Sequence, residues 1–111
     1  MALGLFGAST GAAAALRVAA DFPRHVAAVV SRGGRPDLTG DDKLAQVIAS
    51  TLLIVGGHDF GVIELNEETY RKLNCEKELS IVPGATHLFE ESGALEKVAA
   101  LAAHWFKRHL Q

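Results

Sequence analysis

The sequence lacks the features that mark several classes of protein. It contains a single cysteine, Cys75, so an internal disulfide is excluded and the chain suits a reducing compartment. Its 13 acidic and 11 basic residues are interspersed, so no basic stripe would attract nucleic acid or a membrane surface. No apolar run approaches the roughly 20 residues that cross a bilayer, and no basic segment precedes the first apolar run as in a secretion signal. We therefore expect a soluble, cytoplasmic protein without nucleic-acid or membrane partners.

Aromatic residues are also few, at 6% of the chain, whereas hydrophobic residues make up 49%. A core built from this composition must be mainly aliphatic and rich in alanine. With 111 residues, the chain is long enough to bury such a core but not to form more than one domain. We expect residues 1–111 to form a single domain.

Four short apolar runs lack the polar alternation of half-exposed strands, which is typical of strands buried on both faces of a parallel sheet. They cover residues 3–6, 26–30, 52–55 and 79–82. Helical patterns lie between and after them: residues 11–20, a short helix opening at Asp41 or Asp42, residues 66–73 with Asn66 as the candidate N-cap, and residues 93–110. This alternation predicts an α/β domain of three layers, α/β/α, with about four parallel strands.

Candidate functional residues follow the predicted strands, at the edge where open parallel sheets bind their ligands. Ser9 follows the first strand, His58 and Asp59 follow the third, and His87 follows the fourth. Asp59 has a second interpretation, because Gly-Gly-x-Asp is also ordinary turn chemistry. The spacing of His, Cys, Asp and Glu fits no zinc site, so we expect neither a metal nor another cofactor.

Ser9 lies in the motif G-x-S-x-G, formed by Gly7 to Gly11, and the chain order Ser, Asp, His is that of α/β hydrolases. In this interpretation the two glycines leave room for a tight strand-to-helix turn that exposes the Ser9 hydroxyl. His87 would take the hydroxyl proton, Asp59 would orient the imidazole, and the backbone N–H of Thr10 would stabilise the oxyanion. Alternatively, Ser9 is a small residue in a small-residue loop. A phosphate-binding loop is rejected, because the glycines fit neither nucleotide-binding pattern and no lysine follows.

Four blocks extend the likeness: GLFGASTGAAAAL, VVSRGGRPDL, TLLIVGGHD followed by IELN, and PGATHLFEESGALEKVA. From Leu3 to Trp105 the chain resembles the C-terminal half of dienelactone-hydrolase-like α/β hydrolases. The resemblance implies a serine hydrolase of a carboxylic ester, thioester or lactone, with Ser9, Asp59 and His87 as its triad. True dienelactone hydrolases use a cysteine nucleophile, so the lactone substrate does not carry over. The family also has about as much chain again before the nucleophile, including the loop that supplies a second oxyanion donor.

Several other polar residues have two interpretations. Arg32 and Arg35 follow the second strand and could bind a substrate carboxylate or phosphate, or could be solvated loop residues. Glu90 and Glu91 are expected at the start of the last helix, where the macrodipole favours acids. The remaining histidines are interpreted as surface or helix-terminal groups: His25, His58, His104 and His109.

A non-enzymatic function is the competing hypothesis. The first strand would be central in a complete α/β hydrolase, but here it would lack a neighbour on one side and leave unpaired backbone and apolar surface. The chain would then be a truncated or split hydrolase half that cannot complete catalysis. We expect a homo-oligomer formed through this strand edge, or pairing of the edge with a separate N-terminal half.

Overall fold

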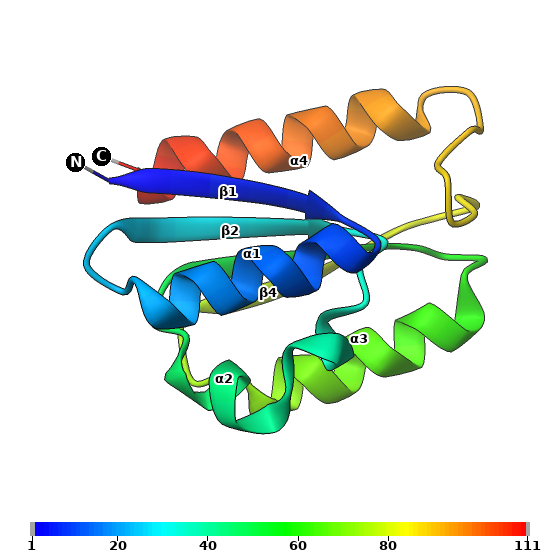
Figure 1. Cartoon of the computed structure of the whole chain (residues 1–111). Helices are drawn as coiled ribbons and strands as arrows, with labels where there is room; N and C mark the ends of the chain where they lie inside the picture. The colour runs from blue at the N-terminus through cyan, green and yellow to red at the C-terminus, as the bar shows by residue number, and fades with distance from the viewer. Residues whose placement is uncertain (1, 111) are drawn as a thin grey trace.

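The computed structural model describes residues 2–110, in which strands and helices alternate along the chain (Figure 1). The elements in order are β1 (Leu3–Ala8), α1 (Thr10–Asp21), β2 (Val26–Arg32), the 3-10 helix η1 (Pro36–Thr39), α2 (Asp41–Gln46), β3 (Ser50–Gly56), α3 (Phe60–Lys72), β4 (Lys77–Val82) and α4 (Ala94–His109). The four strands form one sheet in the order β1-β2-β3-β4, and each neighbouring pair is parallel. The predicted α/β class with four parallel strands is confirmed.

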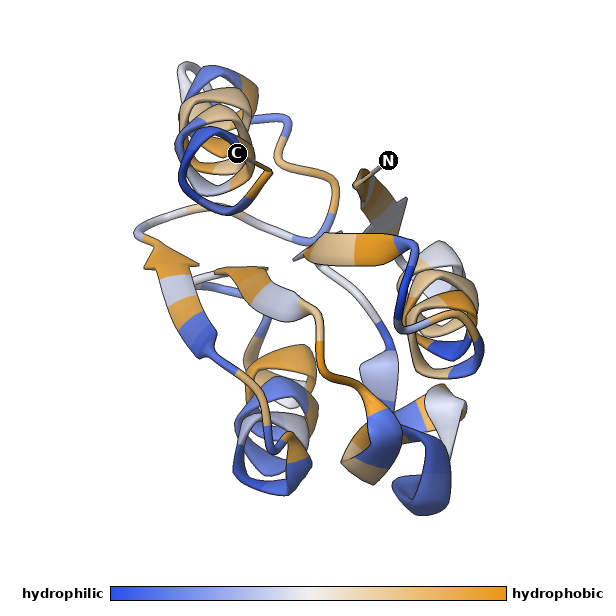
Figure 2. Ribbon diagram, turned by 90° about the vertical axis from the view of Figure 1, so that its left-hand side faces the viewer, coloured by the Kyte–Doolittle hydropathy of each residue, from blue (hydrophilic) through white to orange (hydrophobic). Residues whose placement is uncertain are grey.

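The sheet separates two apolar layers because alternate side chains of a strand point to opposite faces. Val29 and Leu53 belong to the cluster that packs against α1, α2 and α3. Their neighbours Val30 and Leu52 belong to the cluster beneath α4, which also contains Trp105. Seen end-on, the sheet lies between α4 on one side and the other helices on the opposite side, so the three-layer arrangement is present (Figure 2).

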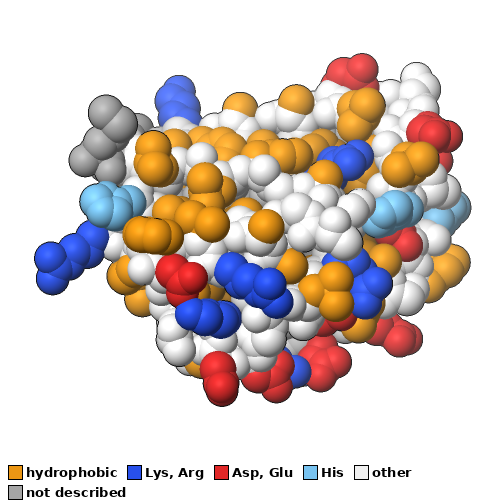
Figure 3. Space-filling view, in the orientation of Figure 1, with side chains coloured by type: hydrophobic (Ala, Val, Ile, Leu, Met, Phe, Trp, Pro, Cys, Tyr) orange, Lys and Arg blue, Asp and Glu red, His pale blue; other side chains and the backbone are white. Residues whose placement is uncertain are grey.

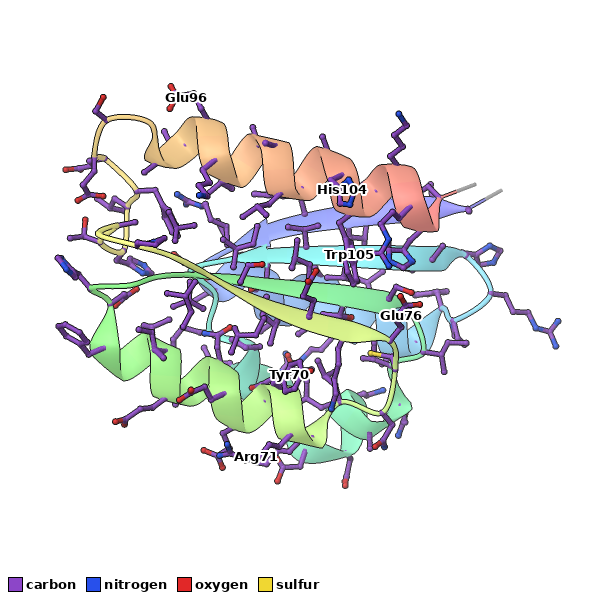
Figure 4. The ribbon with its side chains drawn as sticks, turned by 180° about the vertical axis from the view of Figure 1, so that it is seen from behind. Tyr70, Arg71, Glu76, Glu96, His104 and Trp105 are labelled. Carbon is purple, nitrogen blue, oxygen red and sulfur yellow. The ribbon has the colours of Figure 1, made fainter. Side chains whose placement is uncertain are left out.

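The indole of Trp105 anchors α4 to the sheet. Its ring is buried, and its Nε1–H donates a hydrogen bond of 3.0 Å to the carbonyl oxygen of Ser50 at the start of β3. Figure 4 shows Trp105 on the sheet-facing side of α4, with Glu76 near the same end of the helix. His109 ends this helix as expected, but its ring is largely buried, because it stacks on Trp105 with 4.2 Å between ring centroids.

The predicted start of α3, at Asn66, is wrong. α3 starts at Phe60, directly after Asp59, and Asn66 lies in its middle rather than at its N-cap. The Asn66 side chain is completely buried, and its Nδ2 donates a hydrogen bond of 2.8 Å to the carbonyl oxygen of Val62 one turn earlier. The Nδ2 group therefore finds its partners within the helix and the core, which removes the usual reason for asparagine to stop a helix.

The other elements differ from the prediction mainly at their ends. β1 continues to Ala8 because it pairs with β2 as far as Ala8 and Arg32, and β4 begins at Lys77, which pairs with Thr51. β4 is an edge strand and therefore tolerates the polar residues that hid its start in the sequence. No helix of the described residues is long and apolar enough to span a membrane.

The strand that precedes Ser9 is the opposite edge of the sheet. β1 pairs only with β2 in the described chain, and its side chains Leu3 and Phe6 are 46% and 50% exposed. The space-filling view shows hydrophobic side chains in a band across the face that carries β1 (Figure 3). An exposed edge strand with apolar side chains is a surface on which a further strand can pair.

Candidate functional site

Ser9 occupies a sharp turn between β1 and α1. Its backbone has φ 51° and ψ −124°, a left-handed conformation that is costly for a residue with a side chain. Gly7 permits the turn, because a Cβ at that position would lie 2.5 Å from the carbonyl oxygen of Gly11 and 2.7 Å from the nitrogen of Ala12. The strand-to-helix turn expected around Ser9 is therefore present.

Gly11 does not have the role predicted for it. A Cβ added there would meet nothing within 4 Å, so this chain places no steric demand for glycine at the second glycine of the G-x-S-x-G pattern. The close approach is one-sided: the backbone of Gly11 presses on the Cα of Gly7, while the Gly11 Cα faces open space.

The structure brings Ser9, His87 and Asp59 into one hydrogen-bonded chain. The Ser9 hydroxyl oxygen lies 3.0 Å from His87 Nε2, and His87 Nδ1 lies 2.8 Å from Asp59 Oδ2. An ionised carboxylate only accepts hydrogen bonds, so Nδ1 carries the proton in this contact. In the neutral imidazole, Nε2 then accepts the hydroxyl proton of Ser9. The side chain of Asp59 is 17% exposed and that of His87 is 40% exposed, so the pair meets solvent on the histidine side.

The loops that carry Asp59 and His87 are packed directly on each other. The backbone N–H of His58 donates to the carbonyl oxygen of Ala85 at 2.9 Å, and a Cβ at Gly56 would lie 2.4 Å from that same oxygen. Glycine at the end of β3 thus lets the loop after β4 approach closely. The position of Asp59 relative to His87 follows from this backbone contact and from their own hydrogen bond.

Glu91 and Phe89 fix the shape of the His87 loop. The Glu91 carboxylate accepts hydrogen bonds from the Thr86 N–H at 3.0 Å and from the Thr86 hydroxyl at 2.7 Å, and these bonds lower the pKa of Glu91. Phe89 has a positive φ of 55° and a completely buried ring, which anchors the loop in the core beneath α4. Glu91 was expected to decorate the start of α4, but its side chain instead closes the turn that presents His87.

The backbone N–H of Thr10 is available at the turn. Thr10 is the first residue of α1, and the N–H groups of a helix's first turn have no intrahelical carbonyl to bond. The positive end of the helix dipole points the same way.

The two candidate arginines have partners within the chain. The Arg35 guanidinium bonds the Asp37 carboxylate through two contacts of 3.0 Å, which raises the pKa of Arg35 and lowers that of Asp37. Arg32 lies over the Phe89 ring, 5.4 Å from its centroid, and reaches the Leu88 carbonyl oxygen at 3.5 Å. Arg32 is therefore beside the His87 loop, whereas the Nε and Nη2 groups of Arg35 already bind Asp37.

Sequence reasoning missed four residues that shape the loops around the site: Gly56, Phe89, Glu91 and Gly33, where φ is +53° and a Cβ would lie 3.3 Å from the His87 carbonyl oxygen. None of them belongs to a recognisable motif. The weak signal available was the Gly33-Gly34 pair directly after a buried strand, which indicates close backbone approach. Within residues 2–110, no group of three or more His, Cys, Asp and Glu side chains is placed to hold a metal ion.

The chain is similar to parts of longer known proteins. No family model matches it. A Mycobacterium tuberculosis protein named "Putative phosphoribosyl transferase" is 60% identical over 108 residues, which are 97% of this chain and 24% of that protein. The crystal structure of a dienelactone hydrolase from Anabaena variabilis matches with 56% identity and a TM-score of 0.95, over 97% of this chain and 50% of that one. The esterase domain of a Rhodothermus marinus protein matches with 21% identity and a TM-score of 0.85, over 97% of this chain and 62% of that one.

The chain thus has part of an α/β-hydrolase fold. It spans about a quarter of the curated relatives it matches and half of the dienelactone hydrolase. The predicted likeness to that hydrolase fold is confirmed at this level.

Proposed function

We propose that this chain carries the reacting residues of a serine hydrolase that acts on a carboxylic ester, thioester or lactone. The observation that supports this most is the chain of hydrogen bonds from the Ser9 hydroxyl through His87 to Asp59. The similarity of this polypeptide to a dienelactone hydrolase and to an esterase domain points to the same class of reaction.

The proposed reaction proceeds through an acyl-enzyme. His87 Nε2 takes the hydroxyl proton as Ser9 Oγ attacks the carbonyl carbon, and Asp59 stabilises the imidazolium that forms. The Thr10 N–H stabilises the tetrahedral oxyanion. Collapse expels the alcohol or thiol with the proton from His87. Water, activated by His87, then releases the acid and restores Ser9, so that no cofactor is needed.

Two further roles belong to this proposal. Arg32 lies closest to the His87 loop and is the better candidate to bind an anionic group of the substrate, with Arg35 second because of its bond to Asp37. The single cysteine supports a reducing compartment such as the cytoplasm.

The alternative function is that of a non-catalytic half that pairs through β1. The observation favouring it is the half-exposed Leu3 and Phe6 on an edge strand that would be central in the complete fold. Only one backbone donor is identified for the oxyanion, and loss of one such donor costs about 3 kcal/mol in the barrier. We propose that the free edge of β1 accepts a strand from the remaining half of a hydrolase fold. A second copy of this chain is the other occupant to be tested.

The name of the M. tuberculosis relative describes a protein of which this chain matches 24%. The described residues hold no nucleotide-binding glycine pattern, and the Gly7–Gly11 turn is instead occupied by the contact between Ser9 and His87.

Hydrolysis of a short-chain p-nitrophenyl ester tests the proposal. The wild-type chain is expected to turn over the ester, and Ser9→Ala is expected to reduce the rate to that of buffer. Cys75→Ala is the matched control, because it removes the other nucleophile and should leave the rate unchanged. Equal rates for Ser9→Ala and wild type would refute the proposal.

Sedimentation velocity at micromolar concentration tests whether another strand pairs with the free edge of β1. A stable monomer that does not bind an added N-terminal hydrolase half would contradict pairing at β1. Substitution of Phe6 by Lys should abolish pairing, because it places a charge on the apolar edge.

A further inference from the structure

One segment of the chain touches both Ser9 and His87 without belonging to either loop. It runs from Arg32, the last residue of β2, to Arg35. The N–H of Ser9 donates to the Arg32 carbonyl oxygen at 3.3 Å, and the N–H of Arg35 donates to the Ser9 carbonyl oxygen at 3.0 Å. The costly backbone conformation of Ser9 is thus held on both sides by this one segment.

The same segment also packs closely against His87. Gly33 has φ +53°, and a Cβ at this position would lie 3.3 Å from the His87 carbonyl oxygen and 3.4 Å from His87 Nδ1. The Gly33 N–H is itself fixed by a 2.7 Å hydrogen bond to the Ile54 carbonyl oxygen in β3. The distance between the Ser9 hydroxyl and the imidazole therefore depends on where this segment lies.

A side chain from α3 holds the middle of the segment. Asn66 is completely buried, and its Nδ2 donates hydrogen bonds to the carbonyl oxygens of Gly34 at 3.2 Å and Val62 at 2.8 Å. Its Oδ1 is buried without a hydrogen-bond partner among the described residues.

We propose that Asn66 is a positioning residue of the site: its amide fixes Gly34, and so holds the Arg32–Arg35 segment against both Ser9 and His87. Asn66 touches neither reacting residue. Its link to the reaction rests on the proposed hydrolase function, but its control of the Ser9 backbone does not. Since α3 begins directly after Asp59, one helix then positions the acid at its start and the serine and histidine through Asn66.

Amide hydrogen exchange tests the control of the backbone, and fluorophosphonate labelling of Ser9 tests its link to the reaction. Asn66→Leu and Asn66→Asp both remove the Nδ2 donor. The leucine introduces no charge, and the aspartate keeps a volume similar to that of asparagine. Thr69→Val is the matched control: Thr69 is buried one turn later on α3, and no hydrogen bond of its side chain is present among the described residues. In both Asn66 variants, the amides of Ser9 and Arg35 should exchange at least about tenfold faster, while the Leu53 amide in β3 keeps its rate. Labelling of Ser9 should slow by a similar factor.

Exchange and labelling that match those of Thr69→Val would overturn the proposal. Faster exchange without any labelling of the wild type would retain the positioning role and refute the hydrolase function instead. If neither Asn66 variant folds, hydrogen exchange of the Asn66 side-chain amide in the wild type tests the proposal. The Asn66 Nδ2 protons should exchange as slowly as the Arg35 amide, and exchange at the rate of an exposed amide would contradict the proposal.

Discussion

The two glycines of the G-x-S-x-G pattern should respond in opposite ways to the same substitution. In Gly7→Ala, the new Cβ would lie 2.5 Å from the Gly11 carbonyl oxygen, whereas ordinary contacts begin at 3.4 Å, so the turn must open by about 0.9 Å. The obstructing atoms belong to the backbone and cannot rotate away. Overpacking of this kind costs about 1–3 kcal/mol, offset by about 0.4–1 kcal/mol from the stiffer unfolded chain. The expected net loss is about 1–2 kcal/mol, which lowers Tm by roughly 4–8 °C.

Gly11→Ala is the control within the same motif. Its Cβ meets nothing within 4 Å and lies in the first turn of α1, so we expect a gain of about 0.5–1 kcal/mol. A displacement of about 1 Å at Ser9 should also reduce ester hydrolysis by about 10²-fold in Gly7→Ala alone. Thermal unfolding followed by circular dichroism, together with the esterase assay, measures both effects. Equal Tm values and rates for the two variants would refute the close approach described for Gly7.

Three further predictions concern the His87 loop and the lone cysteine. Phe89→Ala should lower the free energy of unfolding by about 3–5 kcal/mol in urea titration, because it empties the core position that anchors the loop; a loss below about 1 kcal/mol would contradict this. The bonds from Thr86 lower the pKa of Glu91, so their stabilisation is present above the unfolded pKa and is lost as the pH falls through the folded pKa. Glu91→Gln should therefore flatten the fall of Tm in acidic buffer below the ordinary pKa of a glutamate, about 4.3, and an unchanged profile would argue against the contact. Burial raises the pKa of the Cys75 thiol, so it should react with a thiol reagent at neutral pH at least about tenfold more slowly in the folded chain than in urea; equal rates would show that it is exposed.

The fold could be predicted from the sequence because its strands are continuous apolar runs. Val29 and Leu53 pack on one face of the sheet and Val30 and Leu52 on the other, so both faces need apolar residues. The start of α3 was missed because the side chain of its N-cap, Asp59, bonds His87 instead of capping the helix, whereas the polar Asn66 resembles a helix start. Its burial depends on a carbonyl group 32 residues away, at Gly34, which no local pattern contains.

The sequence likewise predicts some residues of the candidate site and not the contacts that support them. Ser9, Asp59 and His87 could be selected because parallel strands bring the residues at their carboxyl ends to one edge. The supporting contacts could not, because each joins segments distant in sequence, such as Gly33 beneath His87 or Gly56 against Ala85. Glu91 lies only five residues from Thr86, yet its role requires the loop that the buried Phe89 anchors in the core.

Reaction of the chain with a fluorophosphonate, followed by mass spectrometry, tests most directly whether Ser9 is an activated nucleophile. The arrangement of Ser9, His87 and Asp59 predicts one phosphonyl group per chain, located on Ser9. The rate should fall by at least about 10²-fold in His87→Gln, which lacks the base. No adduct on Ser9, or an equal rate in His87→Gln, would contradict the account.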